Sequence, residues 1–184
     1  MNQISELSKI YRHHIGAPWQ PTLAGAQRVM MVVYAKERER ALRTRIVEFE
    51  QATHDEGHNW EQIDATGWFA EWMASHEYRD TYFEHPELLE SALRSDFRDF
   101  AVQRFTRTLD AADDNTVVAL VGAASLYGFM RVSDLIHSVE SQIRGRLAVF
   151  FPGSKNDNNY RLLDARDGWS YLALPITLHG EWIP

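Results

Sequence analysis

Residues 122–131 have the types and order best suited to binding an anion. They follow an apolar run and precede a helical run, so their backbone amides could hold an anion where the helix begins. Arg131, near that helix start, would add positive charge. Small residues such as Gly122 and Ser125 also permit a tight strand-to-helix turn. We prefer this simpler interpretation, because no complete set of site residues accompanies the loop.

Two other groups of residues have types that suit acid–base or metal chemistry, and both have simpler explanations. Asp164 and Asp167 could act as a carboxylate pair, but Asp-Ala-Arg-Asp-Gly is also a favourable hairpin-turn sequence. His54 and His58 are four residues apart, yet Gly57 is expected to break the helix that would align them on one metal ion. We therefore expect a turn at the two aspartates and surface positions for the two histidines.

The sequence lacks the complete motifs of common catalytic and cofactor sites. Neither G-x-x-x-x-G-K-[ST] nor G-x-G-x-x-G occurs, and neither H-E-x-x-H nor G-x-S-x-G is present. The absence of cysteine excludes disulfides, thiolate catalysis and cysteine-based zinc sites. We accordingly expect no catalytic residues, no metal ion and no cofactor.

The charge and hydropathy patterns narrow the class of partner. The formal net charge is −7, whereas a nucleic-acid groove binder usually needs a surplus of Lys and Arg. The arginines of residues 37–45 alternate with Glu37 and Glu39, which favours a solvated helix face. The N-terminus has no basic segment followed by an apolar run, and the longest apolar runs are too short to span a bilayer. We expect a cytoplasmic protein without direct nucleic-acid or membrane binding.

Continuous apolar runs and apolar stripes at helical spacing predict the strands and helices that position these residues. The strongest strand candidates are nearly continuous in hydrophobicity, as in a buried parallel sheet: residues 28–35, 116–121 and 146–151. Weaker strand candidates are residues 60–65, 160–163 and 171–176. Helical stripes cover residues 3–13, residues 36–54 and a segment from about 127 or 129 to 143. Pro152-Gly153 is expected to end its strand, 155–159 to form a polar turn, and 164–169 a hairpin turn.

The alternation of strands and helices predicts an α/β fold. We expect a three-layer, mostly parallel sheet, Rossmann-like or NTPase-like but without a phosphate loop, with an antiparallel C-terminal edge. A helical elaboration around 67–111 would interrupt the sheet, its second helix opening at Pro86. Residues 1–184 are predicted to be a single domain, with an N-terminal helix and loop at 1–26.

Ligands of open α/β sheets bind beyond the carboxyl ends of the strands. The candidate ligand-binding or partner-binding residues at that edge are Ser125, Tyr127, Arg131, Pro152, Gly153 and Asn156. The tryptophans at 60, 68, 72 and 169 are expected in the core. Trp19, in a Pro-rich loop, and Trp182, near the C-terminus, are expected to dock on a partner or to pin the termini.

Two segments resemble the BrxB family of the BREX bacteriophage-exclusion systems. The first is the strand 117–121 with the turn that follows it, which reads G-x-x-x-L-Y-x-F-x-R from Gly122 to Arg131. The second is V-F-F-P-G, from Val149 to Gly153, followed by Asn-Tyr-Arg-Leu at 159–162. Both signatures occur in order and close together, within residues 117–162.

The resemblance implies a small non-catalytic subunit that acts by protein–protein contacts as a scaffold or adaptor. The partners it implies are other BREX subunits, foremost a PglZ-type alkaline-phosphatase-fold protein and a large ATPase. The family brings no catalytic residues to carry over. The alternative is a nucleotide-binding or anion-binding sensor or enzyme with a degenerate NTPase-like core, motivated by the parallel strand order and the loop before Arg131.

Overall fold

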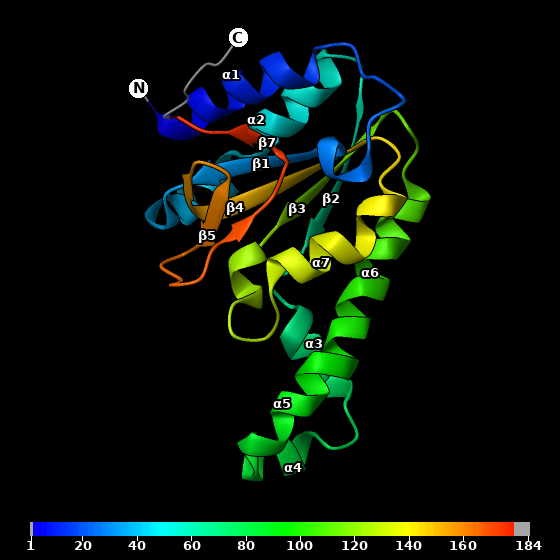
Figure 1. The fold of residues 1–184 in the computed structure, drawn as a ribbon, viewed down its shortest axis with the longest axis vertical. Coiled ribbons are helices and arrows are strands. Elements are labelled where there is room, and N and C mark those ends of the chain that lie inside the picture. Colours follow the sequence, from blue (N-terminus) through cyan, green and yellow to red (C-terminus); the bar gives the residue numbers. More distant parts are fainter. Residues whose placement is uncertain (1, 179–184) are drawn as a thin grey trace.

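The computed structural model describes residues 2–178, which fold around a mixed seven-stranded sheet (Figure 1). The strands are β1 (Val29–Tyr34), β2 (Asn59–Asp64), β3 (Thr116–Val121), β4 (Arg146–Asn156), β5 (Asn159–Leu162), β6 (Trp169–Ser170) and β7 (Leu174–Ile176). The main path runs β2-β3-β4-β1-β7, and every neighbouring pair along it is parallel. The predicted α/β class with a mostly parallel sheet is therefore confirmed.

Helices cover both faces of the sheet. The longer ones are α1 (Gln3–Ile15), α2 (Glu39–Asp55), α3 (Trp68–Ser75), α6 (Arg98–Ala111) and α7 (Val132–Val139). Helices α1 and α2 lie on one side, while α3, α6 and α7 lie on the other (Figure 1). Short 3₁₀ turns occupy Gly25–Arg28 (η1), Lys36–Arg38 (η2), Ala123–Leu126 (η5) and Glu140–Gln142 (η6). No helix within residues 2–178 is long and apolar enough to cross a membrane.

The side chains on the two faces of the central strands belong to two separate hydrophobic cores. In β4, Phe150 packs into the core under α1 and α2, whereas Phe151 packs into the core under α3, α6 and α7. Both side chains are fully buried. Successive strand residues point to opposite faces, so a strand covered on both sides must be apolar at every position. This requirement explains the continuous apolar runs of β1, β3 and β4.

The segment between β2 and β3 projects away from the sheet as a helical extension (Figure 1). After α3 it comprises α4 (Arg79–Glu84), the 3₁₀ turn η3 (Pro86–Leu88), α5 (Leu89–Ala92) and the π-helical turn η4 (Leu93–Phe97), and it returns along α6. Pro86 does open the second helical stretch, as predicted. The elaboration predicted at 67–111 therefore matches the structure closely.

The π-helical turn has a reason in the spacing of the apolar residues. Buried positions Phe97, Ala101, Phe105 and Leu109 recur every fourth residue, and Leu93 precedes them at the same interval. In a helix of 3.6 residues per turn, such a row drifts around the axis. A π turn holds more residues, so it compensates for part of the drift. The small side chain of Ala101 belongs to the same buried row.

The prediction that Pro152-Gly153 ends its strand is wrong. Pro152 is the last residue of β4 that pairs with β1, opposite Tyr34, and from Gly153 onward β4 pairs antiparallel with β5. The strand therefore changes partners rather than ending, and the missing N–H of proline falls where the partner changes. The polar turn shrinks to two residues, Asp157 and Asn158.

The C-terminal strands also differ from prediction. Of the expected strand 171–176, only Leu174–Ile176 forms a strand, β7, and it pairs parallel with β1. The antiparallel partner of β5 is instead β6, which begins at Trp169, the last residue of the expected hairpin turn. The antiparallel part is thus limited to β4, β5 and β6. Strand β7 covers the otherwise open edge of β1, where unpaired backbone groups would remain.

Candidate functional site

A groove lies at the carboxyl edge of the sheet, between the loop after β3 and the β5–β6 hairpin. Its volume is about 640 Å³, within the range of small-molecule sites. The lining residues that bear on function are Tyr127, Arg131, Tyr160, Leu162, Arg166 and Trp169. The position agrees with the rule that open α/β sheets bind ligands beyond their strand ends.

The structure brings only two of the six candidate residues into this groove, Tyr127 and Arg131. Ser125 lies in η5 behind it, and Asn156 closes the β4–β5 hairpin opposite Asn159. Pro152 is buried inside β4. Gly153 is also within the strand, and its role is steric: a Cβ there would lie 2.0 Å from the carbonyl oxygen of Arg161.

The loop 122–128 does not open a helix, which corrects the anion-binding hypothesis for its amides. Gly122 adopts a left-handed conformation (φ 75°) and leads into η5, and α7 begins only at Val132. The amides of Ser125 and Tyr127 donate to carbonyl oxygens inside the loop, at 3.0 and 3.1 Å. These N–H groups are therefore used by the turn itself. The predicted helix start near 127 or 129 is several residues too early for the same reason, because α7 begins at Val132.

Alternate side chains of this loop point into the protein and out of it. Leu126 is fully buried, and Phe129 stacks on Phe69 of α3 with ring centroids 3.8 Å apart. Tyr127 is 54% exposed. The side chain of Arg131 forms no hydrogen bond or ion pair with any residue from 2 to 178. Leu126 and Phe129, which point inward, fix the loop to the protein. Tyr127 and Arg131, which point outward, remain available for a partner or ligand.

The wall formed by the hairpin is aromatic. Phe151, Tyr160 and Trp169 contact one another with ring centroids 5.5 to 6.0 Å apart. Burial raises the pKa of Tyr160 to about 12, so its hydroxyl stays protonated at neutral pH and can act only as a weak acid. The indole N–H of Trp169 is buried and lacks a partner among the described residues.

The hairpin turn that the aspartates were expected to form is confirmed. Tyr160 pairs with Trp169 across antiparallel β5 and β6, so residues 163–168 connect the two strands. The backbone N–H of Leu163 donates to the carbonyl of Pro152 at 2.8 Å, and Lys36 after β1 forms an ion pair with Asp164. These contacts tie the hairpin to the carboxyl ends of β1 and β4.

A polar cluster on the same edge was missed from the sequence. Arg43 of α2 donates to Glu39 at 2.8 Å, to Asp64 at 3.1 Å and to Thr66 at 2.7 Å. Burial alone would raise the pKa of Asp64, but hydrogen bonds from Thr66 and Arg43 outweigh it and lower the pKa. The available signals were Glu39 and Arg43 at i, i+4 and an aspartate at a strand end.

Changing Asp64 to asparagine is expected to lower the free energy of unfolding at pH 7 by at most about 1 kcal/mol, because the pair is half exposed. A lowered carboxyl pKa in the folded state contributes stability above the unfolded pKa, and that contribution is lost as the pH falls through the folded pKa. The difference between Asp64→Asn and wild type should therefore shrink towards pH 3 in urea titrations. Asp110→Asn is the control, since Asp110 forms no ion pair with a described residue. A difference that stays constant with pH would contradict this role.

The histidines and the tryptophans that were singled out occupy ordinary structural positions. Trp68 and Trp72 are buried, and Trp60 and Trp169 pack against the two cores. His54 is exposed and His58 is partly buried. The described residues contain no group of three or more His, Asp or Glu that could hold a metal ion. Trp19 stacks on His58, 3.8 Å between centroids, at the opposite edge of the sheet. The expectation for Trp182 falls outside the described residues.

A family model described as "BREX protein BrxB" matches residues 58–175, which is more than half of the chain. The matched range runs from the beginning of β2 to β7, so it includes the helical extension, the groove and both sequence signatures. Searches of curated proteins and of solved structures gave no significant match.

Proposed function

The chain belongs to the BrxB family, and we propose from this membership that it is a non-catalytic adaptor of a BREX phage-defence system. It would act through protein–protein contacts with other subunits of the system, foremost a PglZ-type protein and a large ATPase. The observation that supports this role best is the exposed, apolar end of the helical extension.

That end, residues 77–90 and hereafter the tip, exposes large apolar side chains on a segment that projects from the body. Phe83 is 70% exposed, Tyr78 is 56% exposed and Leu88 is 51% exposed. Three such side chains within eleven residues are more than the isolated surface apolar residues that need no explanation. Aromatic residues are also enriched at the energetic centres of interfaces. A projecting element of this kind can enter a groove on a partner without bringing the sheet into contact.

The charges of the tip define the chemistry of that partner. It carries five carboxylates, from Glu77, Asp80, Glu84, Glu87 and Glu90, against one arginine, Arg79. All six side chains are exposed. The complementary surface is an apolar groove with a rim of Lys and Arg, because opposite potentials favour encounter and fix orientation. A subunit surface with an acidic rim would be repelled.

Replacing both Phe83 and Leu88 with aspartate is expected to abolish co-purification with the partner subunit, because it places two further carboxylates in the apolar centre of the contact. The measurement is affinity co-purification of the tagged chain expressed with the neighbouring BREX subunits. Both side chains are more than half exposed, so the thermal midpoint of the isolated variant should stay close to that of wild type.

The matched control is Val47→Asp on α2, where the apolar side chain is 57% exposed but lies on the body. This variant should retain its partner. If wild type co-purifies with no BREX subunit, the adaptor proposal fails. If the tip variant and the α2 variant lose the partner equally, the tip is not the contact.

A second candidate function is recognition of a nucleotide or another anion in the carboxyl-edge groove. It is favoured by Arg131 and Arg166, which both line the groove and form no ion pair with residues 2–178. A thermal-shift series with ATP, ADP and AMP tests it, since a ligand that binds only the folded state raises the midpoint. No shift for wild type, or the same shift for Arg131→Gln, would exclude this function.

A further inference from the structure

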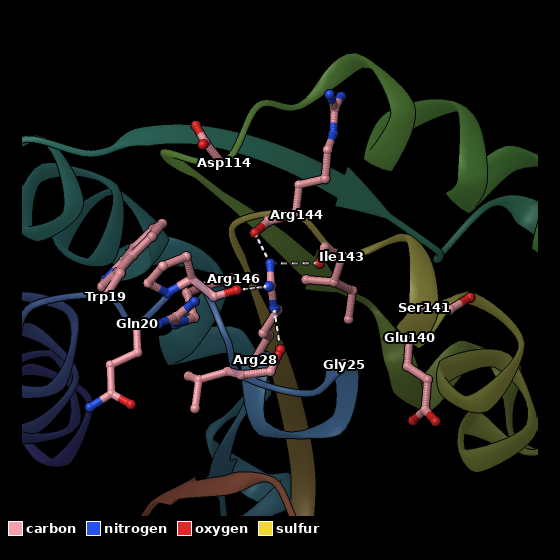
Figure 2. Close-up of a pocket in the computed structure, with 12 residues that line it drawn as sticks. Trp19, Gln20, Gly25, Arg28, Asp114, Glu140, Ser141, Ile143, Arg144 and Arg146 are labelled. Carbon is pink, nitrogen blue, oxygen red and sulfur yellow. Dashed lines mark hydrogen bonds between the residues drawn. The ribbon is translucent and has the colours of Figure 1, made fainter.

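A second cavity lies at the opposite, amino edge of the sheet, where β1 and β4 begin. Its volume is about 550 Å³, and its walls come from the loop before η1 and from the residues between η6 and β4. Arg28, Arg144 and Arg146 all contribute to the lining. Figure 2 shows Arg28 in the middle of this cavity, with Arg146 and Trp19 to one side. Neither the sequence motifs nor the adaptor role accounts for arginines gathered here in an acidic chain.

Arg28 is held rigidly by the backbone around it. Its guanidinium donates to the carbonyl oxygens of Leu23 at 3.0 Å, Pro21 at 2.8 Å and Ile143 at 3.2 Å, and to that of Arg144. All these acceptors are neutral, so the positive charge is positioned without being cancelled. Figure 2 shows these bonds converging on one side chain.

Arg146 is the second fixed cation. Its guanidinium lies 4.6 Å from the ring centroid of Trp19, and the other face of Trp19 is covered by the parallel ring of His58. One of its N–H groups donates to the carbonyl of Gly145 at 3.0 Å, and no other donor of Arg146 has a partner among the described residues. Burial and then the charge of Arg28 lower the pKa of Arg146. An arginine nevertheless stays protonated, so two like charges remain close together.

No carboxylate within residues 2–178 forms an ion pair with Arg28 or Arg146. Asp114 and Glu140 also line the cavity, but Figure 2 shows both carboxylates turned away from Arg28. Glu140 instead accepts a hydrogen bond from Tyr171 at 2.7 Å. Arg144 turns outward and donates to the carbonyl of Asp110 at 2.6 Å. A half-buried pair of cations without an internal counter-charge is costly, and a bound anion would remove that cost.

We propose that this amino-edge cavity is a binding site for an oxyanion, a phosphate or carboxylate group, held by the paired guanidinium groups of Arg28 and Arg146. All three guanidinium nitrogens of Arg28 already donate to carbonyl oxygens, so Arg28 contributes mainly its positive charge. The guanidinium of Arg146 has N–H groups without a partner among the described residues and can donate two parallel N–H bonds to such a group. Both faces of Trp19 are already covered, so the site recognises the charged group rather than a stacked base. It is separate from the carboxyl-edge groove and does not depend on the adaptor role.

Binding is tested by isothermal titration and thermal shift with sodium pyrophosphate and, separately, with sodium citrate, at constant ionic strength. At least one anion should bind wild type and raise its thermal midpoint. Pyrophosphate alone would indicate a phosphoryl ligand, and citrate alone a carboxylate ligand. Arg146→Gln should weaken binding by about tenfold or more, because a charge-assisted hydrogen bond is lost. Arg146→Lys retains the charge but not the planar guanidinium, so its affinity for the anion should lie between those of wild type and Arg146→Gln.

Arg107→Gln, which changes an exposed arginine of α6 that lines neither cavity, is the matched control and should bind the anion as wild type does. The thermal midpoint of each variant without anion shows that it is folded. The proposal is overturned if neither anion binds wild type. It is equally overturned if binding is lost in Arg131→Gln but retained in Arg146→Gln, because the anion would then occupy the groove.

Discussion

Replacing Phe150 with alanine is expected to lower the free energy of unfolding by about 3–5 kcal/mol, the usual cost of truncating a buried phenylalanine. The side chain is fully buried, with Phe49 and Trp60 edge-on at centroid distances of 4.9 and 6.3 Å. It therefore joins α2 to the middle of the sheet. Because β4 lies between β3 and β1, a cavity at Phe150 cannot close by moving an edge strand.

Urea unfolding followed by circular dichroism measures this loss. Phe83→Ala is the control, since Phe83 is 70% exposed and its removal should change stability by less than about 0.5 kcal/mol. Phe151→Ala should cost about as much as Phe150→Ala, although it opens the other core. Similar small losses for all three variants would mean that these faces are not the closed cores described above.

Changing Gly153 to alanine is expected to lower the free energy of unfolding by about 3 kcal/mol, the upper end of the usual cost of overpacking a tight site. The added Cβ would lie 2.0 Å from the carbonyl oxygen of Arg161 and 3.0 Å from the ring of Phe151. The first obstacle is backbone, so β5 must move away from β4. The aromatic wall of the groove would move with it.

The measurement for Gly153→Ala is again urea unfolding, together with hydrogen exchange of the β5 amides, which should lose protection. Gly67→Ala is the control. A Cβ at Gly67 meets only the flexible side chain of Glu71, at 3.1 Å. If Gly153→Ala were as stable as wild type with β5 still protected, the close approach of β4 and β5 would be wrong.

The parts of the fold that the sequence predicted are those in which local pattern and tertiary burial agree. Strands β1, β3 and β4 are covered on both sides, so their apolar runs leave no ambiguity. The helical extension was recognisable because Pro86 and the large apolar residues spaced i, i+4 after Gly67, which are Trp68 with Trp72 and Phe69 with Met73, are local signals. Alternation of these elements then fixed the α/β class.

The remaining elements depend on partners that are distant in the sequence. Pro152-Gly153 has the composition of a strand end, yet β4 continues because β5 supplies a new antiparallel partner just where β1 ends. The apolar segment 171–176 gave no sign that only its last three residues would form a strand, or that this strand would pair with β1 while β6, just before the segment, would pair with β5. Pairing choices of this kind are set by the whole sheet rather than by local propensity.

The candidate site was predicted in its location but only partly in its residues. Tyr127 and Arg131 line the groove, as the edge rule suggested, whereas Pro152 and Gly153 serve the strand. The aromatic hairpin wall and the Arg43–Asp64 cluster require knowledge of which turns meet. The amino-edge cavity was missed completely, because its two arginines, Arg28 and Arg146, are brought together only by the pairing of β1 with β4.

Strand β4 pairs with β5 and with β1, and these two pairings can form at different times during synthesis. The β4–β5 hairpin closes through a two-residue turn and can form as soon as both strands have left the ribosome. Strand β1 is made early, but it can pair with β4 only after Leu147, the partner of Val29, has been synthesised. Long-range parallel pairing of this kind is slow and leaves apolar strands open to aggregation. The nascent chain therefore carries an unpaired, fully apolar β1 through most of its translation, the period in which a chaperone would be needed most.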